Sequence, residues 1–298
     1  MITILTPTYN RAYILPEAFK SLCMQSSYDF EWIIIDDGST DNTAEVVAKW
    51  QNEDLPFKLT YCKQENGGKH RAVNAGVKIA KYDFLLILDS DDRLTETAVS
   101  TINHWVVEIK EDYSFAGVAG LKGTGKQVIG NPIEQEYIDA TNLERGKYAL
   151  YGDKAEIYRT AILRQYPFPE FEGENFIRES AVWDRIAKDG YKIRWYNKVI
   201  YLCEYIEDGL TKNTNSSTYL KNFNGFTYCS KLYIETHSWL PSMHKCGEYY
   251  SVAKHKKFNI KSASKSINVN PLFFMLGIIL FDLKLFIRQI VNKTDRRK

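Results

Sequence analysis

The sequence predicts an α/β fold in which a mostly parallel central sheet is flanked by helices. Short apolar runs of strand length recur through the first hundred residues, and a segment with helical spacing follows each of them. The connections between these segments are short and rich in Gly, Asn, Asp and Pro, which favour turns. Strand and helix alternating at this pace indicate βαβ units and therefore a parallel sheet.

The individual elements follow in that order. Pro16 stands where a first helical turn tolerates proline, and Gly38–Asp41 provides a turn and a helix cap after the second strand. We expect strands at residues 2–6, Glu31–Asp37, Phe57–Cys62 and Asp83–Leu88, and helices at Glu17–Met24, Thr43–Trp50, Lys69–Ala80 and Thr95–Glu111.

The pattern is less regular in the second half. Glycines recur from Gly117 to Gly130, and we expect a flexible connection over 117–132 whose spacing is not that of a phosphate-binding loop. We also expect a helix over 152–165, a helix at Glu179–Lys188 that ends before Gly190, and two paired strands at Lys192–Tyr196 and Val199–Tyr205 with Asn197 and Lys198 as their turn.

The composition narrows the functional classes. A formal net charge of +2 over 298 residues favours neither nucleic acid nor a strongly acidic partner. The five cysteines have no zinc-binding spacing, and the first residues read as a strand and not as a targeting segment. We therefore expect reduced thiols and a cytoplasmic protein.

Polar loops follow four of the predicted strands. They are Thr6–Arg11, Asp36–Asp41, Glu65–Arg71 and Asp89–Arg93. In parallel sheets, ligands bind beyond the carboxyl ends of the strands, so these loops are expected to form one site. The candidate ligand-binding residues of these loops are Thr6, Pro7, Thr8, Tyr9, Asn10, Arg11, Asp37, Lys69, Arg71, Asp89 and Ser90.

The acidic run Asp89-Ser90-Asp91-Asp92 is the sharpest chemical signal. Three carboxylates at one strand end repel one another, and a divalent cation with a phosphate behind it is the usual reason for such a cluster. The alternative is a solvated acidic turn that opens the next helix. Asp36-Asp37 ends a second strand at the same edge, where a carboxylate can accept the imide N–H of uracil and ribose hydroxyls. Lys69, His70 and Arg71 are further candidate cationic contacts.

At these residues the sequence resembles the inverting glycosyltransferases of family 2, which have the Rossmann-like GT-A fold. The matching segments are Pro7–Arg11, Asp36–Asp41, Asn66–Asn74 and Asp89–Asp92, in the family's order. The resemblance implies that Thr8 and Asp37 hold the nucleoside and that Asp89 and Asp91 form the DxD element, which contacts the ribose and the metal. It implies Mn2+ or Mg2+ as cofactor, with Asp91 and Asp92 as the candidate metal ligands.

The resemblance extends to one segment of the second half, Arg178–Gly190. The family has an acidic pair at a helix start, and this chain has Arg178-Glu179, so Glu179 falls at the position of the catalytic base. Glu174 is the competing candidate, and the structural alternative for Glu179 is favourable charge at a helix N-terminus. Relatives often have a loop over the diphosphate at 205–211, sometimes with a His ligand. No His occurs here. Asp208 or Glu204 would be the substitute ligand, and the favoured alternative is a turn whose polar groups are satisfied internally.

The C-terminal segment is apolar and then basic. Pro271–Phe281 is apolar all round, Asp282 and Lys284 interrupt it, and basic residues follow. The unbroken run would extend ~15 Å as a helix, about half of a ~30 Å hydrocarbon core. We therefore expect a helix at the membrane interface with its basic end on anionic lipid. The alternative is docking on the protein's own core or on a second subunit.

Together these features predict a metal-dependent inverting glycosyltransferase with a GT-A domain at 1–210 and a helical region at 211–298. Residues 1–100 would bind the nucleotide and 101–210 the acceptor. The enzyme would move a hexose or N-acetylhexosamine from a UDP-sugar to a hydroxyl of a lipid-linked glycan acceptor. This transfer would serve the synthesis of a cell-surface polysaccharide. We expect a peripheral protein on the inner face of the membrane. We expect no nucleic-acid partner, and the sequence does not determine the oligomeric state.

Two alternatives belong to other functional classes. A nucleotidyltransferase shares the sheet architecture but has a Gly-rich first loop with Arg and Lys, which Pro7–Asn10 does not resemble. A non-catalytic sugar-nucleotide-binding or scaffold protein of a membrane-bound synthase complex would keep the acids but release no nucleotide.

Overall fold

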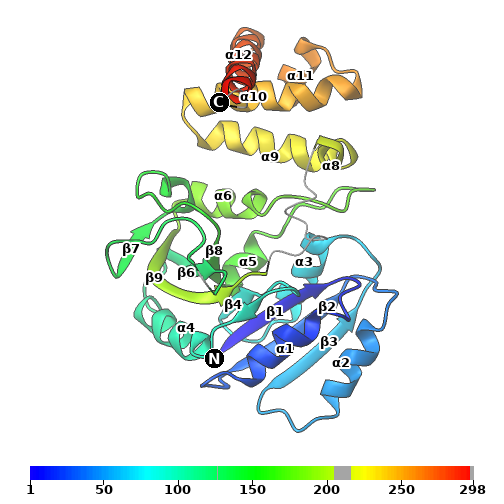
Figure 1. The fold of residues 1–298 in the computed structure, drawn as a ribbon, viewed down its shortest axis with the longest axis vertical. Coiled ribbons are helices and arrows are strands. Elements are labelled where there is room, and N and C mark those ends of the chain that lie inside the picture. Colours follow the sequence, from blue (N-terminus) through cyan, green and yellow to red (C-terminus); the bar gives the residue numbers. More distant parts are fainter. Residues whose placement is uncertain (126, 205–215, 296–298) are drawn as a thin grey trace. The chain divides into compact units, whose positions relative to one another are not determined.

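The computed structural model describes residues 1–125, 127–204 and 216–295, which form two compact units (Figure 1). The first unit comprises Met1–Glu170 and the segment that begins at Arg185. The second comprises Phe171–Asp184 and the C-terminal helices.

The first unit is built on a mixed sheet that has nine strands among the described residues. Its order is β3-β2-β1-β4-β8-β6-β9-β5, with β7 paired to β9. The strands are β1 (Ile2–Thr8), β2 (Phe30–Asp36), β3 (Lys58–Lys63), β4 (Phe84–Ile87), β5 (Arg93–Leu94), β6 (Phe115–Gly123), β7 (Tyr137–Ala140), β8 (Lys154–Arg159) and β9 (Lys192–Leu202). Strands β1 to β4 are parallel, β8 runs antiparallel to both β4 and β6, and β6 and β9 are parallel. The predicted α/β class is confirmed.

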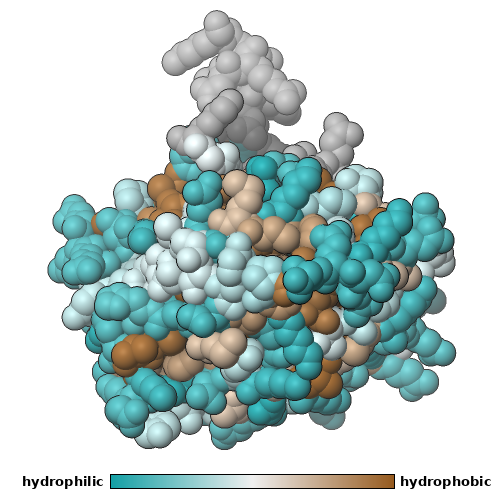
Figure 2. All heavy atoms as spheres, turned by 90° about the horizontal axis from the view of Figure 1, so that it is seen from below, coloured by the Kyte–Doolittle hydropathy of each residue, from teal (hydrophilic) through white to brown (hydrophobic). Residues whose placement is uncertain are grey.

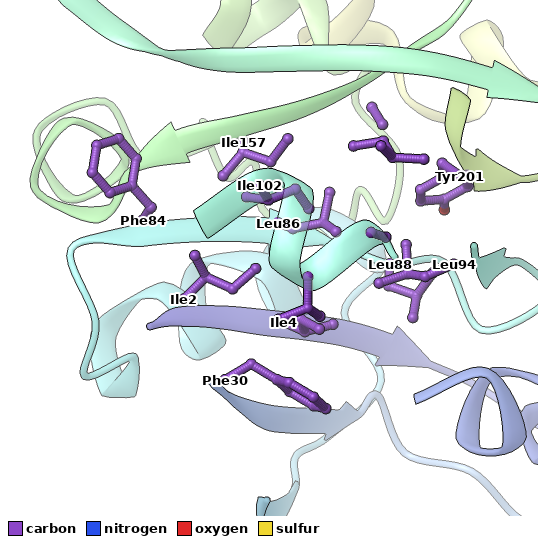
Figure 3. Close-up of a cluster of buried hydrophobic side chains, with 14 of the residues drawn as sticks. Ile2, Ile4, Phe30, Phe84, Leu86, Leu88, Leu94, Ile102, Ile157 and Tyr201 are labelled. Atoms are coloured by element: carbon purple, nitrogen blue, oxygen red, sulfur yellow. The ribbon is translucent and has the colours of Figure 1, made fainter. Parts of the chain in front are cut away.

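Helices cover both faces of the parallel part of the sheet. They are α1 (Leu15–Cys23), α2 (Thr43–Gln51), α3 (Lys69–Ile79), α4 (Ala98–Glu108) and α5 (Thr160–Gln165). A short 3-10 turn, η1 (Asn142–Glu144), lies between β7 and β8. Apolar side chains of α1, α2 and α4 share one buried cluster with the strands, and Figure 3 shows Ile102 of α4 over Ile4 and Leu86. Helix α3 contacts β1 and β2, where a Cβ on Gly76 would lie 2.2 Å from Leu5 Cδ1. Only a glycine therefore allows α3 to approach β1 this closely.

The glycines after α4 form a strand and not a flexible connection over 117–123. A Cβ on Gly117 would lie 1.9 Å from the Ile157 carbonyl oxygen, and one on Gly120 would lie 2.6 Å from Ile200 Cγ1. These glycines mark close packing of β6 against β8 and β9. The expectation was wrong here because glycine reports a close backbone approach as readily as flexibility.

Two further expectations for the second half are corrected. The predicted helix over 152–165 begins as strand β8, and only α5 is helical. The predicted strand at Lys192–Tyr196 and the start of the predicted strand at Val199–Tyr205 are one strand, β9, which ends at Leu202. Tyr205 lies outside the described residues. Ala119 pairs with Trp195 and Leu121 with Val199, so the expected turn residues form an irregularity within β9 that pairing to β6 holds in place.

The second unit is helical. It contains α8 (Ser216–Lys221), α9 (Phe223–Thr236), α10 (Trp239–Ala253), η2 (Lys254–Lys256), α11 (Ile260–Ser266) and α12 (Pro271–Asp295), and it includes the start of α6 (Ser180–Lys188). Phe226, Tyr249 and Phe274 belong to its buried apolar cluster. Helices α10 and α12 cross closely, because a Cβ on Gly277 would lie 2.3 Å from the Met243 carbonyl oxygen.

The face of the molecule shown in Figure 2 is mostly hydrophilic. Apolar side chains on it form small, separated patches, which is ordinary for a surface exposed to water.

Candidate functional site

Hydrogen bonds join the loops that leave β1 and β2. These two strands are parallel with Thr8 opposite Asp36, so both loops leave the same edge of the sheet. The Asp37 amide donates to the Thr8 carbonyl over 2.8 Å. Asn10, at a φ of 52°, donates its amide to Ser39 Oγ over 2.8 Å and accepts the Thr40 amide on Oδ1 over 2.7 Å. These hydrogen bonds hold the predicted nucleotide loop in a defined conformation.

Asp37 organises the glycine turn before α3. Its buried carboxylate accepts the Gly67 amide over 3.0 Å, the Gly68 amide over 2.7 Å and Gln64 Nε2 over 2.8 Å. Several amide donors that converge on one buried carboxylate stabilise its negative charge, and they do so at Asp37. Gly68, at a φ of 95°, gives the turn a conformation that other residues rarely adopt.

The neighbouring Asp36 has a structural role. Its Oδ1 accepts the Ser39 amide over 2.7 Å, and its Oδ2 accepts the Tyr61 hydroxyl over 2.5 Å. Burial and this carboxylate raise the pKa of Tyr61 well above its usual value.

Thr8 differs from Thr3 and Thr6, the other threonines of β1. Thr3 donates its hydroxyl to Glu31 Oε1 over 2.8 Å. The Thr6 hydroxyl is buried and accepts Trp32 Nε1 over 2.9 Å, so its polar atom is satisfied within the core. The Thr8 hydroxyl is also buried, yet it has no hydrogen-bond partner within the described part of the chain. Because an unpaired buried hydroxyl costs stability, this atom is suited to a ligand.

The remaining predicted residues of this loop lie around Thr8. Pro7 is buried in β1, whereas Tyr9 is 47% exposed. Arg11 donates from Nη1 to the Tyr13 hydroxyl over 2.7 Å.

The start of α3 supplies one cation to the acidic loop. Lys69 Nζ lies 2.6 Å from Asp89 Oδ1. Arg71 instead holds the glycine turn, because its Nη1 donates to the Gly67 carbonyl over 2.9 Å and its Nε pairs with Glu170 at 3.3 Å. His70 is 5% exposed, and burial lowers its pKa to about 4. The expectation that His70 adds a cationic contact is therefore wrong at neutral pH.

Asp89 is held from three sides. Its amide donates to the Tyr201 hydroxyl over 2.9 Å, and Tyr201 is fully buried at one end of the apolar cluster in Figure 3. Burial alone would raise the pKa of the Asp89 carboxyl, but Lys69 and Lys122 hold it below its usual value. The Lys122 ammonium also lies 4.2 Å from the centre of the Tyr201 ring.

Asp91 and Asp92 have different environments. The Asp91 carboxylate is half-buried and has no hydrogen-bond or ion-pair partner in another described residue, and burial and Asp89 raise its pKa. Asp92 is 6% exposed, accepts the Glu204 amide over 3.1 Å, and its pKa is raised by burial to about 6. Asp92 therefore holds the backbone that follows β9 in place, whereas the Asp91 carboxylate oxygens are available to a ligand. Ser90, which lies between Asp89 and Asp91 in the chain, is buried.

These residues fit a divalent cation that is shared with a ligand. No three His, Cys, Asp or Glu side chains lie close enough together to hold a metal ion, as far as residues 1–125, 127–204 and 216–295 are concerned. Mg2+ and similar ions are commonly held by one or two carboxylates together with substrate phosphates. Asp91 and Asp89 offer that set.

Sequence reasoning missed Lys122 and Tyr201. Both reach the acidic loop only because β6 and β9 lie side by side, with Lys122 opposite Tyr201. No local motif marks either residue, so no sequence signal points to them.

The two candidate bases lie in the second unit and differ in their contacts. Glu179 precedes α6 and is exposed. Glu174 is buried and accepts the amides of Asn224 and Gly225 over 2.7 and 2.8 Å, in the first turn of α9. Glu174 thus stabilises a helix start, which leaves Glu179 as the candidate.

The predicted loop over the diphosphate, including Asp208, lies outside the described residues. Glu204 pairs with Arg93 through its carboxylate.

A family model described as glycosyl transferase family 2 matches residues 3–152. Poly(ribitol-phosphate) beta-N-acetylglucosaminyltransferase TarS of Staphylococcus aureus is 28% identical over 172 residues, which are 56% of this chain but only 29% of TarS. The GalNAc(5)-diNAcBac-PP-undecaprenol beta-1,3-glucosyltransferase of Campylobacter jejuni is 25% identical over 99% of this chain and 96% of its own length.

Solved structures show the same fold. TarS residues 1–349 in complex with UDP-GlcNAc superpose with a TM-score of 0.62 at 21% identity, covering 88% of this chain and 74% of that one. The mannosyltransferase PcManGT from Pyrobaculum calidifontis, in complex with GDP-Man and Mn2+, gives 0.55 at 15% identity and covers 94% and 86%. Both likenesses support the predicted GT-A architecture.

The environment of His70 predicts how stability depends on pH. The folded pKa of about 4 lies below the ordinary 6.5, so acid protonates the unfolded chain first and stability falls as the pH drops from about 6.5 toward 4. Between pH 7 and pH 5, the free energy of unfolding of His70→Gln should fall by about 1–2 kcal/mol less than that of the wild-type protein. Urea unfolding of both proteins at both pH values measures this, and an unchanged pH dependence in the variant would show that His70 is solvated.

Proposed function

Because the chain belongs to glycosyl transferase family 2, we propose that it transfers a hexose or N-acetylhexosamine from a UDP-sugar to a hydroxyl of a glycan acceptor, with inversion. The observation that supports this most strongly is the edge of the parallel sheet. There the Thr8 hydroxyl, at the end of β1, has no hydrogen-bond partner among the described residues. The Asp37 turn follows β2, and the Asp89–Asp91 loop, with Lys69 beside it, follows β4.

The donor is proposed from the chemistry of these loops. Thr8 would hydrogen-bond the nucleoside, and Asp37 would keep the turn that borders it in place. A UDP-GlcNAc complex is known for TarS, whose fold this chain shares, and this supports a uridine donor. Lys69 adds positive charge beside the acids, which a diphosphate requires.

A divalent cation, Mn2+ or Mg2+, is proposed at Asp91 with Asp89. When bound, it would neutralise charge on the departing nucleoside diphosphate. The complex of PcManGT with Mn2+ supports a metal in this fold. Asp92 is the weaker of the two predicted ligands, because its carboxylate already accepts the Glu204 amide.

Glu179 is proposed as the base that takes the proton from the acceptor hydroxyl. Its exposed carboxylate stands at the start of α6, whereas the carboxylate of Glu174 is occupied by two backbone amides. Removing that proton makes the attacking oxygen a better nucleophile for the anomeric carbon.

The acceptor is proposed to be a lipid-linked glycan, used in cell-surface polysaccharide synthesis at the inner face of a membrane. The Campylobacter jejuni relative, which matches almost the whole chain, is named for a glycan carried on undecaprenol diphosphate. TarS, which matches 56% of this chain, is named for transfer to poly(ribitol-phosphate).

A screen of nucleotide sugars tests the proposed donor and metal. We expect UDP to be released from UDP-hexoses or UDP-N-acetylhexosamines, faster with manganese than with a chelator, and GDP-sugars to give none. Thermal unfolding with each nucleotide detects binding without turnover. Stabilisation by a UDP-sugar without release of UDP, in the presence of glycan acceptors, would identify a non-catalytic binding protein.

Replacing Glu179 tests the base. Glu179→Gln should retain donor affinity and lose about 100-fold or more in the rate of transfer, because it cannot accept a proton. Glu172→Gln, an exposed glutamate of the same segment, is the matched control and should transfer at the wild-type rate. Full activity of Glu179→Gln would exclude it as the base.

A further inference from the structure

Helix α12 is buried along one narrow stripe. Phe274 and Gly277 are buried, and Phe273, Ile278 and Phe281 are partly buried. Their spacing places them on the side of α12 that packs on α10. This stripe accounts for all of the burial between Pro271 and Arg288.

The rest of α12 exposes large apolar side chains. A helix on the surface of a soluble protein normally has polar residues opposite its buried stripe. Here the charged residues between Pro271 and Arg288 are Asp282, Lys284 and Arg288 itself. The exposed apolar side chains, each 38–62% accessible, are Leu272, Met275, Leu276, Ile279, Leu280, Leu283, Leu285, Phe286 and Ile287.

A strongly basic segment lies next to this helix. The exposed lysines of η2, α11 and the turn between them are Lys254, Lys256, Lys257, Lys261 and Lys265. The sequence has no acidic residue between Glu248 and Asp282 to balance them. Helix α11 contacts α12, and both lie on the side of α10 that faces away from α9 (Figure 1).

We propose that the exposed face of α12 and these lysines form one surface that binds an anionic lipid bilayer. Apolar side chains would enter the interface, and the ammonium groups would pair with lipid phosphates. Among the described helices, none alone has the length and hydropathy needed to cross a bilayer. The pair Ile260–Ser266 and Pro271–Arg288, bent by 104°, meets those criteria only jointly.

The positive charge beside α12 favours an anionic bilayer over a second copy of the chain as the partner of this surface. A two-fold interface through α12 would bring two lysine-rich segments to the same contact, where like charges repel. A helix pair would also cover one seam, whereas the exposed apolar residues of α12 occupy more than one side. An anionic surface satisfies both features. The inference goes beyond the transfer reaction, and its test does not use activity.

The apolar part is tested with the full chain and two vesicle preparations. We expect the wild-type protein to float with phosphatidylcholine–phosphatidylglycerol vesicles (70:30) and to bind pure phosphatidylcholine at least tenfold less. Ile279→Glu with Leu283→Glu should lose vesicle binding and keep the wild-type melting temperature, because both side chains are exposed. Val107→Glu, a 68% exposed apolar residue of α4, is the control and should bind like wild type.

The charged part is tested by Lys256→Glu with Lys261→Glu. Each lysine near an anionic surface contributes about fivefold to binding, so this variant should bind the anionic vesicles more than about tenfold less tightly. Added salt should weaken wild-type binding in the same way. Lys49→Glu with Lys110→Glu, two exposed lysines of the first unit, makes the same charge change and should leave binding unaffected.

Two results would overturn the proposal. One is a wild-type protein that floats with neither preparation. The other is a wild-type protein that is a dimer by light scattering, does not bind vesicles, and becomes monomeric when Ile279→Glu and Leu283→Glu are introduced. That result would make the exposed face of α12 an interface between two copies of the chain.

Discussion

Carboxylates crowded at one edge of a parallel sheet repel one another, and the first unit is arranged around their compensation. The Asp37 carboxylate is stabilised by hydrogen bonds from the amides of the glycine turn. The charge of Asp89 is balanced by the Lys69 and Lys122 ammonium groups. Asp92 accepts a backbone amide beyond β9. Among the described residues, the Asp91 carboxylate has no partner in another residue. We therefore propose Asp91, together with Asp89, as the carboxylates that would hold a cation.

This compensation connects the core to the site. Tyr201 is part of the apolar cluster, yet its hydroxyl accepts the Asp89 amide and its ring lies beneath Lys122 (Figure 3 labels Tyr201 beside Leu88 and Leu94). The glycines of β6 allow the close strand packing that brings Lys122 there. A change in the packing of β6 or β9 would therefore alter the charge balance at Asp89 without touching a ligand-binding residue.

The sequence predicted the βαβ half of the fold closely, because hydrophobic runs, turn residues and strand-end acids repeat there in a fixed order. The four loops follow strands at one sheet edge, as expected. The second half was harder, because β6, β8 and β9 take their conformation from non-local pairing and their glycines look like linkers. Lys122 and Tyr201 were missed for that reason. The different environments of Asp91 and Asp92 also depend on β9, which lies about a hundred residues away in the chain.

We propose that the edge of the sheet is preorganised for a uridine nucleotide and that the Thr8 hydroxyl forms a hydrogen bond to it. Titration calorimetry of UDP with manganese, on the wild-type protein and on Thr8→Val, tests this most directly. Since the hydroxyl has no partner in the described structure, Val should fold at least as stably. Thr8→Val should bind UDP about tenfold more weakly than the wild-type protein, the cost of one lost hydrogen bond. Thr97→Val, at an exposed position, should bind UDP like the wild-type protein. Equal affinity for UDP in wild type and Thr8→Val would contradict the proposal.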